Sequence, residues 1–125
     1  MDGRSGLHHA CIQNEEVLVE LLLKFKAQVA PADNDGWTPL HFAARNHQVG
    51  IAQKLLQAGA PVDATDAHGN TPLFRAVFES KGRGEMIKFL LEAGADQDRS
   101  NNHGTSPAAL AATIANYNVR QWLKQ

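Results

Sequence analysis

The stretch that decides the fold runs from residue 36 to residue 64 and reads GWTPLHFAARNHQVGIAQKLLQAGAPVDA. It opens with Gly36 and Trp37, which precede a Thr38–Pro39 pair. A threonine hydroxyl caps the first turn of a helix, and proline is favoured at the first helical position, where its missing N–H costs nothing. The pattern therefore predicts a short helix that begins at this pair.

A second helix follows the polar break RNHQ. Apolar residues such as Ile51 and Leu55 share one stripe of a helix from residue 49 to about residue 58, and Gly59 supplies the left-handed residue that ends it. The segment APVDATDAHGN is rich in Asp, Gly and Pro, which predicts a turn or short hairpin. One helix pair cannot bury both of its faces, so neighbouring pairs must stack.

The same pattern repeats along the chain at a nearly constant interval. TPLH begins at Thr38, TPLF begins at Thr71, and SPAA begins at Ser106. LHHACI aligns with LHFAAR one period earlier. The interval from Thr71 to Ser106 is slightly the longer one, and its extra residues are expected in ESKGRG, residues 79–84, as a lengthened loop. The chain thus divides into units at residues 2–34, 35–67, 68–102 and 103–125.

These units resemble the ankyrin repeat, with DGWTPLHFAA, LLQAGAPVDA, GNTPLFRAV and LLEAGADQDR following its signature almost residue for residue. The resemblance covers essentially the whole chain. It implies an all-α repeat solenoid of stacked helix-turn-helix units joined by short β-hairpins or turns. It also implies that His8 and His41 bond backbone and the capping hydroxyl. The terminal units depart from the pattern: Ser5–Gly6 replaces Thr-Pro, Lys26 replaces Gly, and Trp122 is expected to seal the last unit.

The bulk composition predicts a single, non-secreted domain. The chain has 125 residues and a formal net charge of −1, which argues against non-specific binding to nucleic acid. Its only cysteine, Cys11, excludes an internal disulfide and fits a reducing compartment. No apolar run is long enough to span a bilayer, and the first residues lack a secretory signal. We expect a cytoplasmic protein without membrane contact that is a monomer when free.

Trp37 suggests where a partner binds. Ankyrin-like proteins bind partners on the concave face formed by hairpin tips and first helices, and the family leaves the Trp37 position variable. Trp37 and Phe78, flanked by Arg45 and Arg75, resemble a binding patch, because exposed aromatics and arginines form interface hot spots. Alternatively, Trp37 packs along a neighbouring hairpin and Phe78 tucks under the loop at residues 79–84. The candidate partner-binding residues are Asn34, Asp35, Trp37, Phe42, Arg45, Asn46, His68, Asn70, Arg75, Phe78, Glu79, Asn102, His103 and Thr113.

Catalytic and metal chemistry find little support in the sequence. His8, His9 and Cys11 lie within one helical turn, but no second close pair stands at ligand spacing for zinc. No nucleophile elbow or phosphate-binding glycine loop occurs. The paired aspartates fall in the predicted hairpins, where they resemble turn-forming residues and leave an acidic edge that favours a basic partner. We expect no enzyme activity, no metal and no cofactor.

The last unit narrows the class of partner. GTSPAALAATIANYNVRQWLK resembles the final repeat of small bacterial ankyrin proteins, some of which are toxin immunity proteins. The resemblance implies that the chain covers a toxin's active site or target-binding surface. The alternative is a stand-alone adaptor, or an enzyme inhibitor such as a kinase inhibitor. These hypotheses share one fold and one face and differ in the partner.

Overall fold

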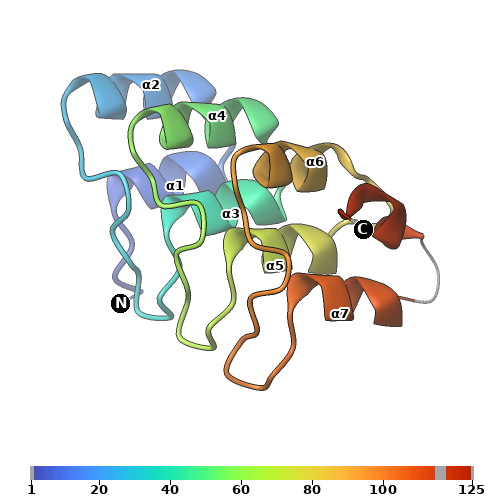
Figure 1. The fold of residues 1–125 in the computed structure, drawn as a ribbon. Helices are drawn as coiled ribbons and strands as arrows, with labels where there is room; N and C mark the ends of the chain where they lie inside the picture. The colour runs from blue at the N-terminus through green and yellow to red at the C-terminus, as the bar shows by residue number, and fades with distance from the viewer. Residues whose placement is uncertain (1, 115–117, 125) are drawn as a thin grey trace.

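The computed structural model describes residues 2–114 and 118–124, which form seven α-helices, one 3-10 helix and no strand. The short inner helices are α1 (Gly6–Ile12), α3 (Pro39–Arg45), α5 (Pro72–Phe78) and α7 (Pro107–Thr113). The outer helices are α2 (Glu16–Lys24), α4 (Val49–Gln57) and α6 (Glu85–Glu92), followed by the 3-10 helix η1 (Val119–Trp122). Figure 1 shows two helical layers with turns projecting from the inner one. The predicted all-α repeat solenoid is confirmed, with turns between the repeats.

Every inner helix begins with a hydroxyl cap, as the repeated Ser or Thr predicts. The side chain at each cap accepts a hydrogen bond from the backbone N–H three residues on, at Ser5, Thr38, Thr71 and Ser106. This bond satisfies one of the amides that a helix start leaves unpaired.

The two predicted structural histidines join one repeat to the next. The backbone N–H of Ser5 donates to Nδ1 of His8 (3.0 Å), and that of Thr38 donates to Nδ1 of His41 (3.1 Å). Because Nδ1 accepts, Nε2 carries the proton and donates to a carbonyl in the following repeat. His8 reaches the carbonyl of Trp37 at 2.6 Å, and His41 reaches that of Asn70 at 2.9 Å. The role that the resemblance implied is confirmed.

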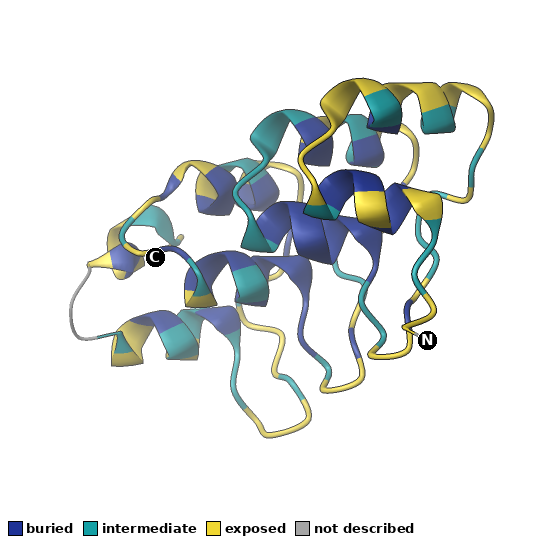
Figure 2. Ribbon diagram, turned by 180° about the vertical axis from the view of Figure 1, so that it is seen from behind, coloured by how far each residue is buried: buried dark blue, intermediate teal, exposed yellow. Residues whose placement is uncertain are grey.

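The core lies between the two layers of helices. Leu40, Ile51, Leu55 and Leu73 are at most 1% exposed, and Figure 2 shows the inner helices α3 and α5 largely buried. Cys11 belongs to this core, and burial raises the pKa of its thiol to about 12. A thiol with such a pKa stays protonated and unreactive, as a structural cysteine does.

The turns form a second line of contacts. Backbone N–H groups of Asn34, Ala67 and Asn102 donate to carbonyls of the preceding turn at 2.8–2.9 Å. Successive turn tips therefore lie at a fixed spacing, which brings their variable residues onto one surface.

The third and fourth units show the predicted irregularities. Helix α5 ends at Phe78 and α6 begins only at Glu85, so the extra residues lengthen the loop at residues 79–84 as expected. Trp122 packs on this repeat, because its ring leaves no space for a Cβ at Gly84 and Nζ of Lys88 lies 5.3 Å from the ring centroid. Among the described helices, none is long and apolar enough to cross a membrane.

Lys26 adopts a backbone conformation that suits glycine. Its φ is 64°, while the equivalent residues Gly59 and Gly94 have φ of 102° and 100°. A side chain in the left-handed region costs roughly 1 kcal/mol relative to glycine. Lys26→Gly should therefore raise the free energy of unfolding in urea by about 1 kcal/mol. Lys24→Gly, inside α2, should lower it by a similar amount, and stabilisation by both changes would contradict this explanation.

Stability should depend on the protonation of His41. Burial lowers its pKa from the ordinary 6.5, and the hydrogen bond to the Asn70 carbonyl opposes this shift only in part. The unfolded chain therefore binds a proton more readily than the folded one. The contribution of His41 to the free energy of unfolding should be constant well above pH 6.5 and fall as the pH drops from there through the lowered pKa.

Urea titrations over a pH series would measure this dependence. The variant His41→Gln should have a shallower acid slope, while His9→Gln, at an exposed position of α1, should retain the wild-type slope. An unchanged slope in His41→Gln would show that other groups cause the acid loss.

Candidate functional site

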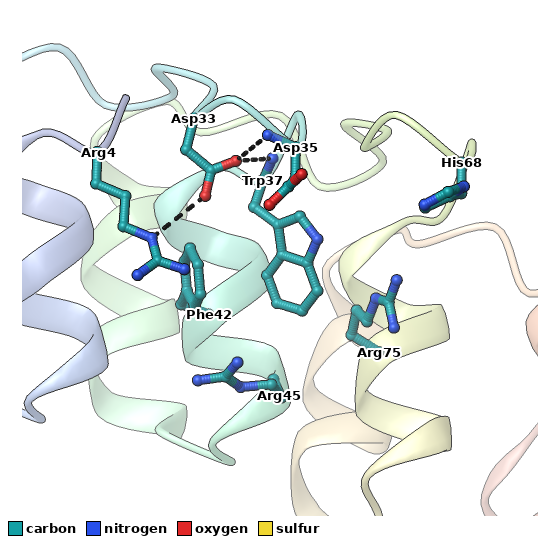
Figure 3. A pocket seen from close by; sticks show the side chains of 8 residues that line it. All are labelled: Arg4, Asp33, Asp35, Trp37, Phe42, Arg45, His68 and Arg75. Carbon is teal, nitrogen blue, oxygen red and sulfur yellow. Dashed lines mark hydrogen bonds and ion pairs between the residues drawn. The ribbon is translucent and has the colours of Figure 1, made fainter. Parts of the chain in front are cut away.

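A cavity of about 280 Å³ opens where the turns meet the inner helices of the first three repeats. Six of the fourteen predicted residues line it: Asp35, Trp37, Phe42, Arg45, His68 and Arg75. Two further residues, Arg4 and Asp33, complete its wall. Figure 3 shows the side chains converging from the start of the chain, from the turns that precede α3 and α5, and from these two helices.

Two aromatic rings form the floor of the cavity. Phe42 is only 2% exposed, and its ring centroid lies 4.7 Å from that of Trp37 at an angle of 42°. Trp37 also lies 5.7 Å from His41 and is half-buried. The indole is thus packed on α3 of its own repeat and lines the cavity, and its role in binding a partner stays a prediction.

Three guanidinium groups surround these rings. Cζ of Arg75 lies 4.7 Å and that of Arg45 lies 5.5 Å from the Trp37 centroid. Arg45 and Arg4 also lie 5.1 and 5.0 Å from the Phe42 centroid. Such cation–π contacts hold flexible arginines in place and keep positive charge beside the aromatic surface. The arrangement is therefore an aromatic floor with a cationic wall.

Two buried carboxylates fix the turns that carry this wall. Oδ1 of Asp33 accepts from the backbone N–H groups of Asp35 and Trp37, both at 2.9 Å, and Oδ2 accepts from Nε of Arg4 at 3.5 Å. One repeat later, Asp66 accepts from two turn amides and from Nη2 of Arg75 at 3.2 Å. Both carboxylate side chains are at most 2% exposed.

Two charged side chains of the cavity, Arg45 and Asp35, form no ion pair among the described residues. Asp33 neutralises Arg4 and Asp66 neutralises Arg75, whereas no ion pair within residues 2–114 and 118–124 involves Arg45 or Asp35. Nε of Arg45 donates to Oδ1 of Asn46 at 3.2 Å, and the rest of its guanidinium has no carboxylate partner in that part of the chain. Nε of Arg75 is buried without any hydrogen-bond partner and is not accessible from the cavity. The remaining N–H groups of Arg45 can donate to an anionic or carbonyl oxygen beside Trp37.

Four of the remaining predicted residues do not line the cavity and take part in hydrogen bonds within the chain. Asn70 is 6% exposed, and its carbonyl accepts from His41 while its Oδ1 accepts from Asn101. Asn46 and Glu79 follow the ends of α3 and α5, and the Glu79 carbonyl accepts from Nε2 of His47 at 2.8 Å. The hydroxyl of Thr113 donates to the carbonyl of Leu110.

The other four predicted residues are exposed. Phe78 is 57% exposed and does not line the cavity, so it neither joins Trp37 there nor tucks under the following loop. Asn34 and Asn102 bond to neighbouring turns, and His103 stacks on His68 with a centroid distance of 6.3 Å.

Arg4 and Asp33 are absent from the fourteen predicted residues. Arg4 stands one repeat period before Trp37, and Asp33 stands one repeat period before Asp66. Their equivalence to Trp37 and Asp66 in the repeat is the sequence signal that could have identified both residues. Asp33 resembles an ordinary turn aspartate in the sequence, and only the structure shows that it also holds an arginine against the aromatic floor.

The histidine and cysteine cluster of α1 offers no metal site. His8 uses both ring nitrogens in hydrogen bonds, and Cys11 is fully buried. Across residues 2–114 and 118–124, no group of three or more His, Cys, Asp or Glu side chains could hold a metal ion.

Asp33→Ala should loosen the turn that presents Trp37. The change removes the acceptor for two backbone N–H groups and an arginine, so the free energy of unfolding should fall by about 1–3 kcal/mol. Asp35→Ala, an exposed carboxylate two residues on, should change it little. Equal effects of the two variants in urea unfolding would rule out the bracing role of Asp33.

Comparison with known proteins agrees with this architecture. A family model described as "Ankyrin repeats (3 copies)" matches residues 1–66, and one described as "Ankyrin repeats (many copies)" matches residues 47–91. No curated protein matches the chain. The first model alone covers more than half of the sequence, and the caps, histidine bridges and stacked turns are those of the same repeat. The chain belongs to the ankyrin repeat family.

Proposed function

We propose that this protein is a non-catalytic binding module that holds a protein partner at the concave cavity and thereby blocks it. Ankyrin repeats are protein–protein interaction modules. The observation that supports this particular surface is the Trp37 indole, half-buried on Phe42 and flanked by the guanidinium groups of Arg45 and Arg75. Tryptophan and arginine in a partly desolvated pocket are the residues that contribute most to interface energies.

The charges of the cavity indicate what the partner presents. Arg45 has no carboxylate partner in the described ranges, and Nε of Arg75 is buried without an acceptor. An acidic side chain of the partner, placed beside Trp37, supplies the carboxylate that Arg45 lacks, while Nε of Arg75 is buried away from the partner. The acidic hairpin edge in the sequence favours a basic partner, but Asp33 and Asp66 are buried and already paired. Asp35, which is exposed at the rim of the cavity, is the carboxylate that would bind a basic or amide group of the partner.

The partner that we propose is a bacterial toxin, which makes this chain an immunity protein. The support is the resemblance of residues 104–124 to the closing repeat of small bacterial ankyrin proteins, of which residues 115–117 lie outside the described ranges. The family matches end at residue 91 and do not reach that segment. The alternative partners are those of an adaptor or of an enzyme inhibitor, and they would use the same cavity.

Trp37→Ala should weaken binding of the partner by about 2 kcal/mol or more, which is roughly 30-fold in Kd. Arg45→Glu should weaken it by a similar factor because it places a second negative charge beside the partner's acid. The measurement is a pull-down from a lysate of the source cell with mass spectrometry, followed by titration of the purified partner by calorimetry.

Phe78→Ala is the matched control, since it removes an exposed aromatic from α5 outside the cavity. Thermal unfolding of each variant separates lost contacts from lost folding. Undiminished capture by both cavity variants would move the binding site elsewhere. A captured toxin that the chain inactivates would support the immunity role, whereas a captured kinase or scaffold component would establish the alternative.

A further inference from the structure

The first outer helix carries an apolar stripe that no described residue covers. Val17 is 79% exposed, Leu21 is 48% exposed and Phe25, at the C-cap, is 73% exposed. These residues are four apart, so they lie one turn above another on a single face. Figure 2 shows this end of the outer layer as largely exposed, in contrast to α3 and α5.

The repeat register shows which way this stripe faces. The equivalent positions of the next repeat, one period further along the chain, are Gly50, Lys54 and Ala58. Nζ of Lys54 contacts Glu16 and Glu20 of α2 at 2.8 and 3.1 Å. A Cβ on Gly50 would lie 2.8 Å from a Glu16 carboxylate oxygen. Since these positions of α4 meet the preceding outer helix, the same positions of α2 form a stacking face without an occupant among the described residues.

The charges on α2 decide which helix would fit. Glu20 and Lys24 line one hollow with Val17 and Leu21 of the stripe. Glu16 lies toward α4, where it and Glu20 contact Nζ of Lys54. A parallel copy of this helix would place Glu20 beside Glu20 and Lys24 beside Lys24. An antiparallel copy places each Glu20 beside a Lys24 and also opposes the two helix dipoles. The face is therefore complementary to itself in the antiparallel orientation.

We propose that the α2 face binds a second copy of this chain about a two-fold axis that passes near Leu21, the middle residue of the stripe. In this arrangement the stripes pack together, with Val17 of each copy toward Phe25 of the other. Glu20 of each copy then lies opposite Lys24 of the other, at the edge of the shallow 250 Å³ hollow that both residues line with Val17 and Leu21. Because a two-fold contact is isologous, every favourable pair occurs twice.

This proposed dimer is an alternative to the monomer that the sequence predicts, and it does not depend on the proposed function. None of the residues in the interface lines the cavity at Trp37. Each dimer therefore carries two open cavities, and the cavity variants should not alter its mass.

Sedimentation equilibrium of the full chain, from micromolar to millimolar protein, tests the proposal. The wild type should show a reversible monomer–dimer equilibrium. Leu21→Glu should abolish it, and Glu20→Lys or Lys24→Glu alone should each weaken it at least about tenfold because like charges then meet twice. Gln53→Lys, which adds positive charge at an exposed position of α4, should leave it unchanged. Circular dichroism of each variant would establish that it remains folded.

The decisive measurement is sedimentation equilibrium of a mixture of the two charge variants. In a Glu20→Lys and Lys24→Glu mixture, the heterodimer pairs opposite charges at both contacts, whereas each variant alone opposes like charges, so the dimer mass should return. A wild type that stays monomeric throughout, or a dimer that survives all three changes on α2, would overturn the proposal. Failure of the mixture to recover association would overturn the contact between Glu20 and Lys24. None of these outcomes involves the partner of the cavity.

Discussion

The hydrogen bonds that cross from one repeat to the next are the constraint on which the rest of this structure depends. His8 and His41 each close the cap of their own helix and donate to a carbonyl 29 residues further along the chain. The turn amides repeat this linkage at the tips. A helix pair of 7 and 9 residues, such as α3 and α4, cannot form a core by itself, so these links and the apolar contacts between layers stabilise the pairs only as a stack.

The cavity is a consequence of the same links. The carbonyl of Trp37 that accepts from His8 belongs to the residue whose indole lines the cavity, so the bridge that joins two repeats also fixes the backbone of the candidate hot spot. The Asp33 carboxylate accepts from the backbone N–H of Trp37 in that turn and also from Nε of Arg4, which it positions. The turn from Asp33 to Trp37 therefore contributes both to the stacking of the repeats and to the proposed binding surface. The surface is preorganised, which reduces the entropy lost when a partner binds.

Much of the architecture could be predicted from the sequence because each part rests on local chemistry. The Thr-Pro pair at Thr38 starts a helix, Gly59 ends one, and the regular repeat period requires stacking. Trp37 could be singled out because the repeat does not need an aromatic there. Phe42 and Phe78 show the limit of this reasoning: both occupy variable positions on helices, yet one is buried beneath Trp37 and the other is exposed outside the cavity. The repeat period shows which residues occupy equivalent positions, but it does not show how far a given side chain is buried.

By itself, then, the sequence determined the repeat, its caps, its two bridging histidines and the turn that carries Trp37, because these depend on residues within one period. Only the tertiary structure decided which charges remain available. Asp33 and Asp66 look like an acidic edge in the sequence, but they are buried against Arg4 and Arg75 and leave Arg45 and Asp35 without an ion pair in the described ranges. The uncovered stripe on α2 was decided in the same way. The physical reason is common to both: burial and pairing of charge depend on neighbours from other repeats, whose distances the order of residues does not specify.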